Sequence, residues 1–402
     1  MNAPATFAPA KAALPTPDGD FYDIKDVLNA DERAILERVR TFTETKVAPI
    51  INDYWVRDAF PFELIEPLKA IDIGHLGIGR GGRPILIGLI AMEFMRVDPS
   101  FATFYGVHTG LAMGSIALLG SDEQKAKWLP AMERFEKIGC FGLTEPLVGS
   151  GTGGGLTTTA KGDGDSWVLN GEKKWIGNAT WCDLSIIWAR DLDDNQVKGF
   201  IVENDTPGFA VEKIENKMAL KVVQNGHITM TDCRVPDANR LQGPNITNSF
   251  RDTGLVLRET RSGVAWAATG IQQGAFELAV KYAQERLQFG KPIGSFQMVQ
   301  DLIARMLGNL TASQAMMLRL AEIEESGKLT DQQASLAKAF TTQRMRETVA
   351  WARELHGANG ILVDYNIGRL FADAEAIYSY EGTFQMQNLI VAKAATGISA
   401  FV

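Results

Sequence analysis

The sequence contains few cysteines and no long apolar segment. Its 402 residues include three cysteines, Cys140, Cys182 and Cys233, and no two of them form a CxxC pair. This small, odd number argues against a disulfide framework and a cysteine-rich metal site, and it suits a reducing compartment. The longest apolar run, residues 84–92, is too short for a bilayer, which takes about 20 residues. We therefore expect no membrane insertion.

The chain also has no excess of basic residues. Lysine and arginine total 40 against 48 aspartate and glutamate residues, which gives a net charge of −8 and a pI of about 5.3. This balance argues against nucleic acid or anionic membrane as a partner. Residues 1–24 are rich in alanine and proline, with one lysine and no arginine, so neither a secretory signal nor a transit peptide is expected. We expect a disordered arm there and a cytoplasmic protein.

The hydrophobic pattern divides the rest of the chain into three parts. Residues 25–138 repeat apolar side chains at spacings of three and four, as helices do, and Asn29 or Asp31 can cap the first helix. Residues 139–245 instead hold short apolar runs between turn residues, and Asn170-Gly171 is a strong hairpin signal. This middle part predicts a small antiparallel β barrel or sandwich.

The helical period returns in residues 246–402. Apolar stripes run through residues 264–282 and 303–320, residues 330–333 form a capping box for a third helix, and a last helix is expected over residues 383–396. Four amphipathic helices with short connections predict a bundle. The expected fold class is therefore mainly α with a central β domain: an N-terminal helical domain, the small β domain and a C-terminal four-helix bundle.

Two features that point to cofactors lack the context that those cofactors need. Residues 149–154 match G-x-G-x-x-G, but the dinucleotide fingerprint requires a helix after it, and hairpin strands are expected there. Such a loop can still offer backbone N–H groups to a phosphate. His75 and His108 have no partners at ligand spacing, so we expect no metal site.

Near the end of the chain, Glu381 stands between two helical runs and among the aromatic residues Tyr378, Tyr380 and Phe384. Loss of water around a carboxylate raises its pKa, which suits a general base near neutral pH. The alternative is that Glu381 only stabilises the positive N-terminus of the following helix. On this stretch alone the structural role is the commoner one, and both interpretations stay open.

Four segments together resemble the acyl-CoA dehydrogenase and acyl-CoA oxidase superfamily, along nearly the whole chain. They are Phe141-Gly-Leu-Thr-Glu-Pro with Gly149-Ser150, Trp175-Ile-Gly-Asn, Glu285-Arg-Leu-Gln-Phe-Gly-Lys-Pro with Phe296-Gln297, and Tyr380-Glu-Gly-Thr. The resemblance is closest to the branch of glutaryl-CoA dehydrogenases and short-chain acyl-CoA oxidases. It implies helical, β and bundle domains in that order, assembled as a homotetramer around FAD.

The resemblance also implies which residues hold the ligands. Trp175 would cover the flavin ring, and Arg286 would bind the FAD pyrophosphate of a neighbouring subunit. The cofactor residues implied are Phe141, Leu143, Thr144, Gly149, Ser150, Trp175, Ile176, Gly177, Arg286, Gln297, Glu354, His356, Gly357, Ala358, Thr383, Gln385 and Gln387. The substrate residues implied are Ala102, Thr103, Ser150, Leu257, Arg258, Arg261 and Gly382.

The same resemblance implies the reaction. A glutamate of this family removes the α-proton of an acyl-CoA while a hydride leaves the β-carbon for FAD, and the product is a 2-enoyl-CoA. Glu381 would be that base, because the family's alternative position is Thr260 here and Glu259 is one residue away. Ala102 stands where glutaryl-CoA enzymes have an arginine for the second carboxylate. We therefore expect a short, uncharged acyl-CoA as substrate.

Several residues depart from the family pattern. Leu147 and Gly151 replace acidic residues of the flavin loop, residues 153–155 lengthen this loop with glycine, and Gly177 replaces a threonine. Three functions remain to be separated. The first is a dehydrogenase that passes electrons to an electron-transferring flavoprotein. The others are an oxidase that uses molecular oxygen and a catalytically altered flavin-binding relative that acts as a scaffold.

Overall fold

The computed structural model describes residue 15 and residues 18–77 and 81–400. Of the expected disordered arm, residues 1–14, 16 and 17 lie outside the described residues. Pro15 accepts a hydrogen bond from Gln284 (3.0 Å), and Ile24 is buried in the short helix η1 (Ile24–Val27), which contacts the bundle. The expectation of disorder is therefore corrected for residues 18–24, because an apolar side chain anchors them.

The N-terminal part is helical. Asn29, one of the two residues predicted as candidates for the first N-cap, forms a capping box with Glu32 at the start of the first helix. The fourth helix is apolar nearly all round because it is buried between the first helix and the C-terminal bundle. The α-helices are α1 (Ala30–Phe42), α2 (Ile51–Arg57), α3 (Ile65–Ala70), α4 (Pro84–Val97), α5 (Pro99–Gly106), α6 (Met113–Leu119) and α7 (Asp122–Glu133).

One helical stretch of this part, Pro99–Leu119, is long and apolar enough to cross a membrane by length and composition. Of its most apolar window, 61% is buried inside the protein, as in a core helix of a globular domain. His108 lies in this stretch, and its ring nitrogens bond the carbonyl of Met132 (2.9 Å) and the amide of Gly139 (3.1 Å). Burial lowers the pKa of His108 to about 4, so its imidazole is neutral and joins two elements.

The central part is one mixed sheet. The strands run in the order β1-β4-β2-β3-β7-β6, with β5 beside β4. Four pairs are antiparallel, but β1 and β2 both run parallel to β4. The small β domain is confirmed, with two parallel pairs that the sequence did not predict. Its strands are β1 (Gly139–Gly142), β2 (Thr159–Asp163), β3 (Ser166–Ile176), β4 (Leu184–Asp191), β5 (Val197–Glu203), β6 (Phe209–Lys213) and β7 (Gly226–Pro236).

The predicted hairpin at Asn170-Gly171 is wrong, since both residues lie inside β3. The register of β3 with β7 shifts between Leu169 and Gly171, which marks a bulge. Gly171 has a φ of 138°, and a Cβ atom there would lie 2.6 Å from the backbone of Thr158. The turn falls instead between β2 and β3, where Gly164 has a φ of 66°. A tight turn and a bulge both favour glycine, so the dipeptide alone could not separate them.

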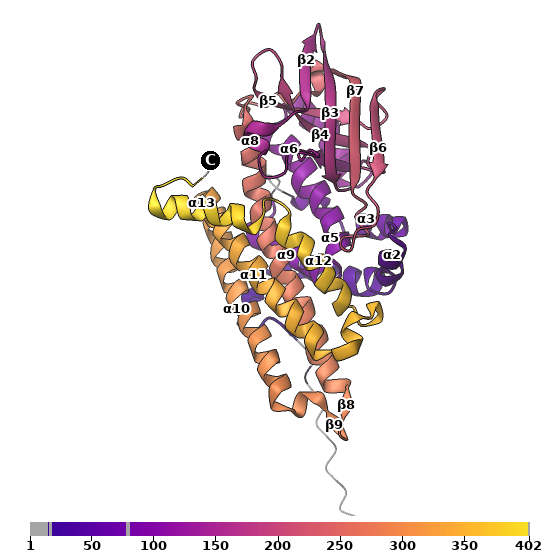
Figure 1. Ribbon diagram of the computed structural model, residues 1–402, viewed down its shortest axis with the longest axis vertical. Coiled ribbons are helices and arrows are strands. Elements are labelled where there is room, and N and C mark those ends of the chain that lie inside the picture. Colours follow the sequence, from indigo (N-terminus) through magenta and orange to yellow (C-terminus); the bar gives the residue numbers. More distant parts are fainter. Residues whose placement is uncertain (1–14, 16–17, 78–80, 401–402) are drawn as a thin grey trace, which may run out of the picture.

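The C-terminal part is a bundle of α9 (Phe250–Glu285), α10 (Gln297–Glu325), α11 (Asp331–Leu355) and α12 (Ile367–Ser379). The helix α13 (Phe384–Thr396) packs on α11 and projects sideways from the bundle (Figure 1). The fourth bundle helix is therefore α12 and not the segment 383–396. The reason is visible in the burial: α12 buries a stripe of apolar side chains, whereas Gln387 is the buried residue of α13.

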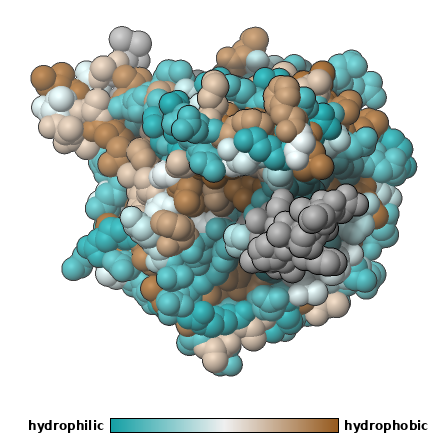
Figure 2. Space-filling view, turned by 90° about the horizontal axis from the view of Figure 1, so that it is seen from below, coloured by the Kyte–Doolittle hydropathy of each residue, from teal (hydrophilic) through white to brown (hydrophobic). Residues whose placement is uncertain are grey.

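The three parts are arranged along the long axis of the molecule. The sheet lies at one end, the N-terminal helices lie beside it, and the bundle extends to the other end (Figure 1). The short strands β8 (Leu287–Gln288) and β9 (Lys291–Pro292) form the far tip of the bundle (Figure 1). Seen from this tip, hydrophobic and hydrophilic residues are interspersed over the surface (Figure 2).

Candidate active site

A cavity of about 1530 Å³ lies where the N-terminal helices, the sheet and the bundle meet. Its lining comes from α4, α5, α9, the edge of the sheet and the loop between α12 and α13. A site for one drug-sized ligand has about 300–1,000 Å³, so this cavity has room for more than one such ligand.

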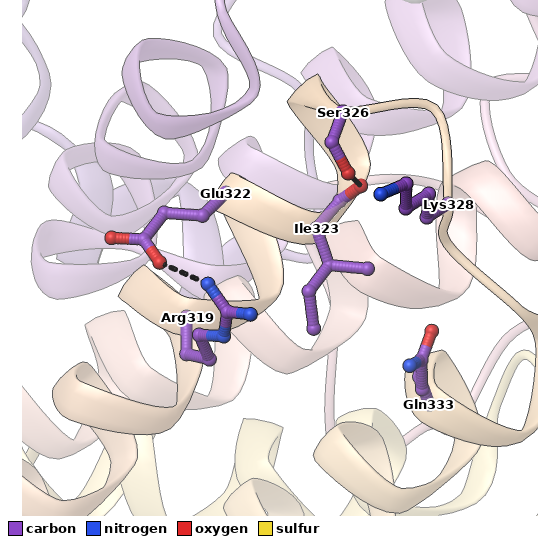
Figure 3. Close-up of a pocket in the computed structure, with 6 residues that line it drawn as sticks. All are labelled: Arg319, Glu322, Ile323, Ser326, Lys328 and Gln333. Atoms are coloured by element: carbon purple, nitrogen blue, oxygen red, sulfur yellow. Dashed lines mark hydrogen bonds and ion pairs between the residues drawn. The ribbon is translucent and has the colours of Figure 1, made fainter.

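A second depression, of about 370 Å³, lies at the turn between α10 and α11 (Figure 3). Arg319 pairs there with Glu322 at 2.6 Å, and the hydroxyl of Ser326 donates to the carbonyl of Ile323 at 2.7 Å. None of the residues that the sequence implied for a cofactor or substrate lines this depression. The large cavity is therefore the candidate site.

Glu381 lies in the loop between α12 and α13 and lines the large cavity. Its φ is 56° and that of Gly382 is 85°, a backbone conformation that a glutamate rarely adopts. Lys338 of α11 donates hydrogen bonds to the carbonyls of Tyr380 and Gly382. The side-chain amide of Gln387 donates to the carbonyls of Glu381 (3.2 Å) and Gly382 (3.0 Å). These bonds hold the strained loop in place.

The Glu381 carboxylate is bound to α9. The hydroxyl of Thr260 donates to Glu381 Oε1 at 2.5 Å. Burial raises the pKa of the Glu381 carboxyl above its ordinary value, and the hydrogen bond from Thr260 and the charges of Lys338 and Arg261 offset part of this rise. A raised pKa is the direction expected from the aromatic residues around Glu381 in the sequence.

The alternative role considered for Glu381 was to stabilise the N-terminus of the next helix. In the structure another residue caps that helix. The side chain of Thr383 caps α13 by accepting a hydrogen bond from the amide of Met386 (3.4 Å). The neighbouring carboxylate on α9, that of Glu259, pairs with Arg258 at 3.0 Å. Neither a helix cap nor an ion pair with an adjacent residue therefore explains the position of Glu381.

Ten of the implied cofactor residues line the cavity. Trp175 is 55% exposed and has a φ of 67°, and Asn225 holds its backbone by donating to its carbonyl at 3.2 Å. An exposed indole in a strained conformation offers a flat apolar face to a ligand. The G-x-G-x-x-G letters form a loop and one helical turn, α8 (Thr152–Gly155), before β2. The ten implied cofactor residues that line the cavity are Phe141, Leu143, Thr144, Gly149, Ser150, Trp175, Ile176, Gly177, Thr383 and Gln387.

Behind this wall lies a buried ion pair that the sequence analysis missed. Lys173 Nζ donates to Glu145 Oε1 at 2.8 Å and to the carbonyl of Leu143 at 3.1 Å. Glu145 also accepts hydrogen bonds from the amides of Thr157 (2.6 Å) and Thr158 (3.0 Å). These partners outweigh the effect of burial and hold the pKa of Glu145 at about 2, while burial lowers that of Lys173 to about 8.

Six of the implied substrate residues also line the cavity. Arg258 is the exception, because its guanidinium pairs with Glu259. Arg261 Nε is buried and has no hydrogen-bond partner among the described residues, so a donor remains available for a bound group. The six are Ala102, Thr103, Ser150, Leu257, Arg261 and Gly382.

The remaining implied residues do not line the cavity. Arg286 follows Arg261 by 25 positions, which places it about 37 Å further along the helix at a rise of about 1.5 Å per residue. The His356 ring stacks on Tyr282 (4.2 Å between centroids) instead of facing the cavity. Arg286 therefore cannot reach the cavity of its own chain. The set comprises Arg286, Gln297, Glu354, His356, Gly357, Ala358 and Gln385.

Sequence reasoning also missed two residues that act on Glu381. Lys338 belongs to an amphipathic helix, where a lysine is normally assigned to the solvent face, and no motif marks it. Thr260 was noted only as a missing base, although its hydroxyl contacts the Glu381 carboxylate. The one available signal was its position one residue before Arg261 in an implied substrate segment.

Comparison with known families matches three models along the chain. The N-terminal domain of acyl-CoA dehydrogenase matches residues 29–136, the middle domain matches residues 140–233, and the C-terminal domain matches residues 250–396. The matches follow one another in the order in which the helical part, the sheet and the bundle occur.

Individual relatives agree with these models. The human mitochondrial short-chain specific acyl-CoA dehydrogenase is 31% identical over 366 residues, 89% of this chain and 88% of the relative. The caffeyl-CoA reductase-Etf complex subunit CarC of Acetobacterium woodii is 32% identical over 370 residues, 89% of this chain and 96% of the relative. A solved glutaryl-CoA dehydrogenase from Mycobacterium smegmatis in complex with FADH2 has a TM-score of 0.91 and 32% identity, and the match covers 96% of this chain and 100% of that one. The resemblance noted in the sequence is thus confirmed, and the chain belongs to the acyl-CoA dehydrogenase family.

Proposed function

We propose that this protein is an FAD-dependent acyl-CoA dehydrogenase that converts a short, uncharged acyl-CoA thioester to the 2-enoyl-CoA. The observation that carries the proposal is the half-buried Glu381, whose carboxylate lines the cavity and accepts a hydrogen bond from Thr260. When bound, FAD supplies the acceptor for the hydride that leaves the β-carbon. Glu381 takes the α-proton onto its carboxylate, the electron pair of the broken α C–H bond forms the α,β double bond, and the pair of the β C–H bond leaves with the hydride.

The cavity fits a flavin nucleotide together with a thioester. Its volume of about 1530 Å³ exceeds what one small ligand needs. The exposed indole of Trp175 offers a stacking surface, and the Gly149-Ser150 loop offers backbone amides and a hydroxyl. The unpartnered Nε of Arg261 is a donor for an anionic or carbonyl group close to Glu381. We infer that these residues hold FAD and the acyl-CoA beside the base.

The first expected outcome of this proposal is turnover of butyryl-CoA. Purified protein loaded with FAD should form the 2-enoyl-CoA in the presence of an artificial electron acceptor, and absorbance of the conjugated thioester measures the product. A panel of longer thioesters would report the chain length that the cavity prefers. If a protein that binds FAD oxidised no acyl-CoA, the result would instead favour the scaffold alternative, which is motivated by the altered flavin loop at residues 147–155.

The cavity wall around Ala102 favours a substrate whose acyl group carries no charge. Ala102 is buried, and the described basic residues that line the cavity are Lys217 and Arg261. Lys217 already donates to the carbonyl of Leu220 (2.7 Å) and to Asn225 Oδ1 (2.8 Å). A second carboxylate would therefore be desolvated beside Ala102 without a cation to compensate it.

We accordingly expect glutaryl-CoA to be turned over at least about 100-fold less efficiently than butyryl-CoA, the effect of an unpaired buried charge costing about 3 kcal/mol. The measurement is the ratio of kcat/KM for the two thioesters. Equal efficiency would show that another cation binds the distal carboxylate. The prediction separates this protein from a similar solved structure, which is named as a glutaryl-CoA dehydrogenase.

The electron acceptor that we propose is an electron-transferring flavoprotein, since one relative is named as a subunit of a complex with Etf. The competing proposal is an oxidase that reduces molecular oxygen, because Trp175-Ile-Gly-Asn also occurs in such enzymes of the resembled superfamily. Release of peroxide during turnover in air, compared with turnover with an artificial acceptor, separates the two.

We also propose that the protein is a homotetramer, or at least a dimer. Arg286 and Gln297 lie at the tip of the bundle, where they can serve only the site of another subunit. Three large apolar residues are exposed at the same tip: Leu287 (60%), Phe289 (84%) and Met298 (84%). An exposed apolar patch of this kind fits a subunit contact.

Sedimentation of the FAD-loaded protein should therefore show an oligomer, and Phe289→Asp should weaken both the assembly and the retention of FAD. A wild-type monomer that retains FAD at micromolar concentration would contradict this arrangement.

A further inference from the structure

Lys338 is a buried cation beneath the loop that carries Glu381. Its side chain lies on α11 and is 0% exposed. Lysine is almost never fully buried unless a partner compensates its charge. The partners here are two backbone carbonyls, those of Tyr380 and Gly382, which flank Glu381 on both sides. Lys338 therefore binds the loop at the peptide group before Glu381 and at the peptide group after Gly382.

The geometry of the loop explains how the two hydrogen bonds from Lys338 affect the position of Glu381. The backbone of Glu381 has a positive φ, which for a residue with a side chain persists only when the surroundings fix it. A shift of either carbonyl rotates the Cα–Cβ bond of Glu381 and moves its carboxylate away from Thr260. Gln387 bonds the same loop from α13, but its amide carries no charge.

The charge of Lys338 acts on the carboxylate as well. Glu381 is the group that favours the charged form of Lys338, and Lys338 in turn favours the ionised form of Glu381. Burial and the nearby guanidinium of Arg261 act in the other direction and lower the pKa of Lys338 to about 7. The charged or titratable groups that face this pair are thus Arg261 on α9 and the phenol of Tyr380.

We propose that Lys338 is a positioning residue for the general base, holding the carbonyls of Tyr380 and Gly382 so that the Glu381 carboxylate stands at the α-carbon of the substrate. This inference rests on the proposed role of Glu381. It predicts that Lys338 contributes to the rate of proton removal and not to the affinity for acyl-CoA, because it lies beneath the loop and does not line the cavity.

The test is Lys338→Met, which replaces lysine with an unbranched side chain one atom shorter and removes the charge and the donors. Reduction of the bound flavin by butyryl-CoA should slow by about 10- to 100-fold, the effect of misplacing a catalytic group by about 1 Å. The Kd of butyryl-CoA should change by less than about threefold. The acid limb of the pH–rate profile should move to higher pH, since the carboxylate loses a stabilising cation.

Two comparisons distinguish positioning from general support of the fold. Lys338→Met should add little to Glu381→Gln, less than about threefold, because both changes act through one carboxylate. Lys127→Met makes the same substitution at an exposed residue of α7 and should leave the rate unchanged. A full additional loss in the Glu381→Gln background, or an unchanged rate and pH profile in Lys338→Met alone, would overturn the proposal.

Amide hydrogen exchange of residues 380–382 in the FAD-loaded protein tests the contact without reference to catalysis. Exchange should be faster in Lys338→Met than in the wild type, even if Glu381→Gln proves active and the proposed function fails. Should Lys338→Met lose FAD, Lys338→Gln, which keeps a donor, takes its place in the same measurements. Loss of FAD in both variants would overturn the proposal, since Lys338 would then serve the whole fold.

Discussion

Replacement of Glu381 by glutamine is expected to slow the reduction of bound flavin by butyryl-CoA by about 10²- to 10⁴-fold, the usual loss for a positioned general base. Glutamine has the same shape as glutamate but cannot take up the α-proton. The loop should keep its conformation, because Lys338 and Gln387 bond its backbone and the Thr260 hydroxyl can donate to an amide oxygen. Binding of FAD and of acyl-CoA should therefore persist, and stopped-flow absorbance of the flavin measures the rate.

The same substitution separates catalysis from a helix-end role. If Glu381 only stabilised the N-terminus of α13, its loss would cost at most about 1 kcal/mol of unfolding free energy and leave the rate alone. Thermal unfolding of both proteins provides that control. A near-normal rate in Glu381→Gln would reject the catalytic role, and Glu259, an acidic residue of α9 that lines the cavity, would be the next candidate.

Replacement of Glu145 by glutamine is expected to lower the free energy of unfolding by about 3–5 kcal/mol, the cost of leaving one charge of a buried pair without its partner. Lys173 is 0% exposed and Glu145 is 2% exposed, so water cannot compensate the remaining ammonium group. Glu145 also binds the amides of Thr157 and Thr158. Urea unfolding of the FAD-free protein measures the change without a contribution from cofactor binding.

A matched control is Glu136→Gln, which breaks the pair of Glu136 with Arg134 at 2.7 Å. Both side chains are about half exposed there, so the expected loss is below about 1 kcal/mol. Equal losses in the two variants would show that burial does not govern the Glu145 pair.

The pH dependence of stability is an independent test of the ion pair between Glu145 and Lys173. The pKa of Glu145 is depressed from 4.5 to about 2 in the folded protein, so its stabilisation is fully present above pH 4.5 and is lost as the pH falls toward 2. Glu145→Gln should remove that part of the pH dependence of stability. Because Lys173 also bonds the carbonyl of Leu143, the variant should bind FAD more weakly as well.

Local signals in the sequence were sufficient where one side chain acts on its own helix. The capping box at Thr330 and the end of α13 after residue 396 lie where the sequence predicted them, and Asn29, one of two predicted candidates, caps α1. Periodicity distinguished the helical parts from the sheet. It could not decide between α12 and α13 as the fourth bundle helix, because both have apolar residues at helical spacing and only packing buries one of them.

The candidate site was predictable to the extent that motifs mark it. The segments around Phe141, Trp175 and Glu381 meet at one cavity, although more than 200 residues separate the first from the last. The contacts of Lys338 with the Glu381 loop and of Lys173 with Glu145 depend on which face of a helix or strand turns inward. A single buried lysine leaves no pattern in the sequence, so these supporting residues required the structure.

The most direct test of the account is the single-turnover reduction of bound flavin by butyryl-CoA that carries deuterium at either the α- or the β-carbon. Wild-type protein should bleach, form the 2-enoyl-CoA and show a primary isotope effect at each position, because in the proposed reaction one hydrogen leaves as a proton to Glu381 and the other leaves as a hydride. A flavin that stays oxidised with every short acyl-CoA, or that is reduced without an isotope effect at the α-carbon, would contradict the assignment of Glu381 as the base.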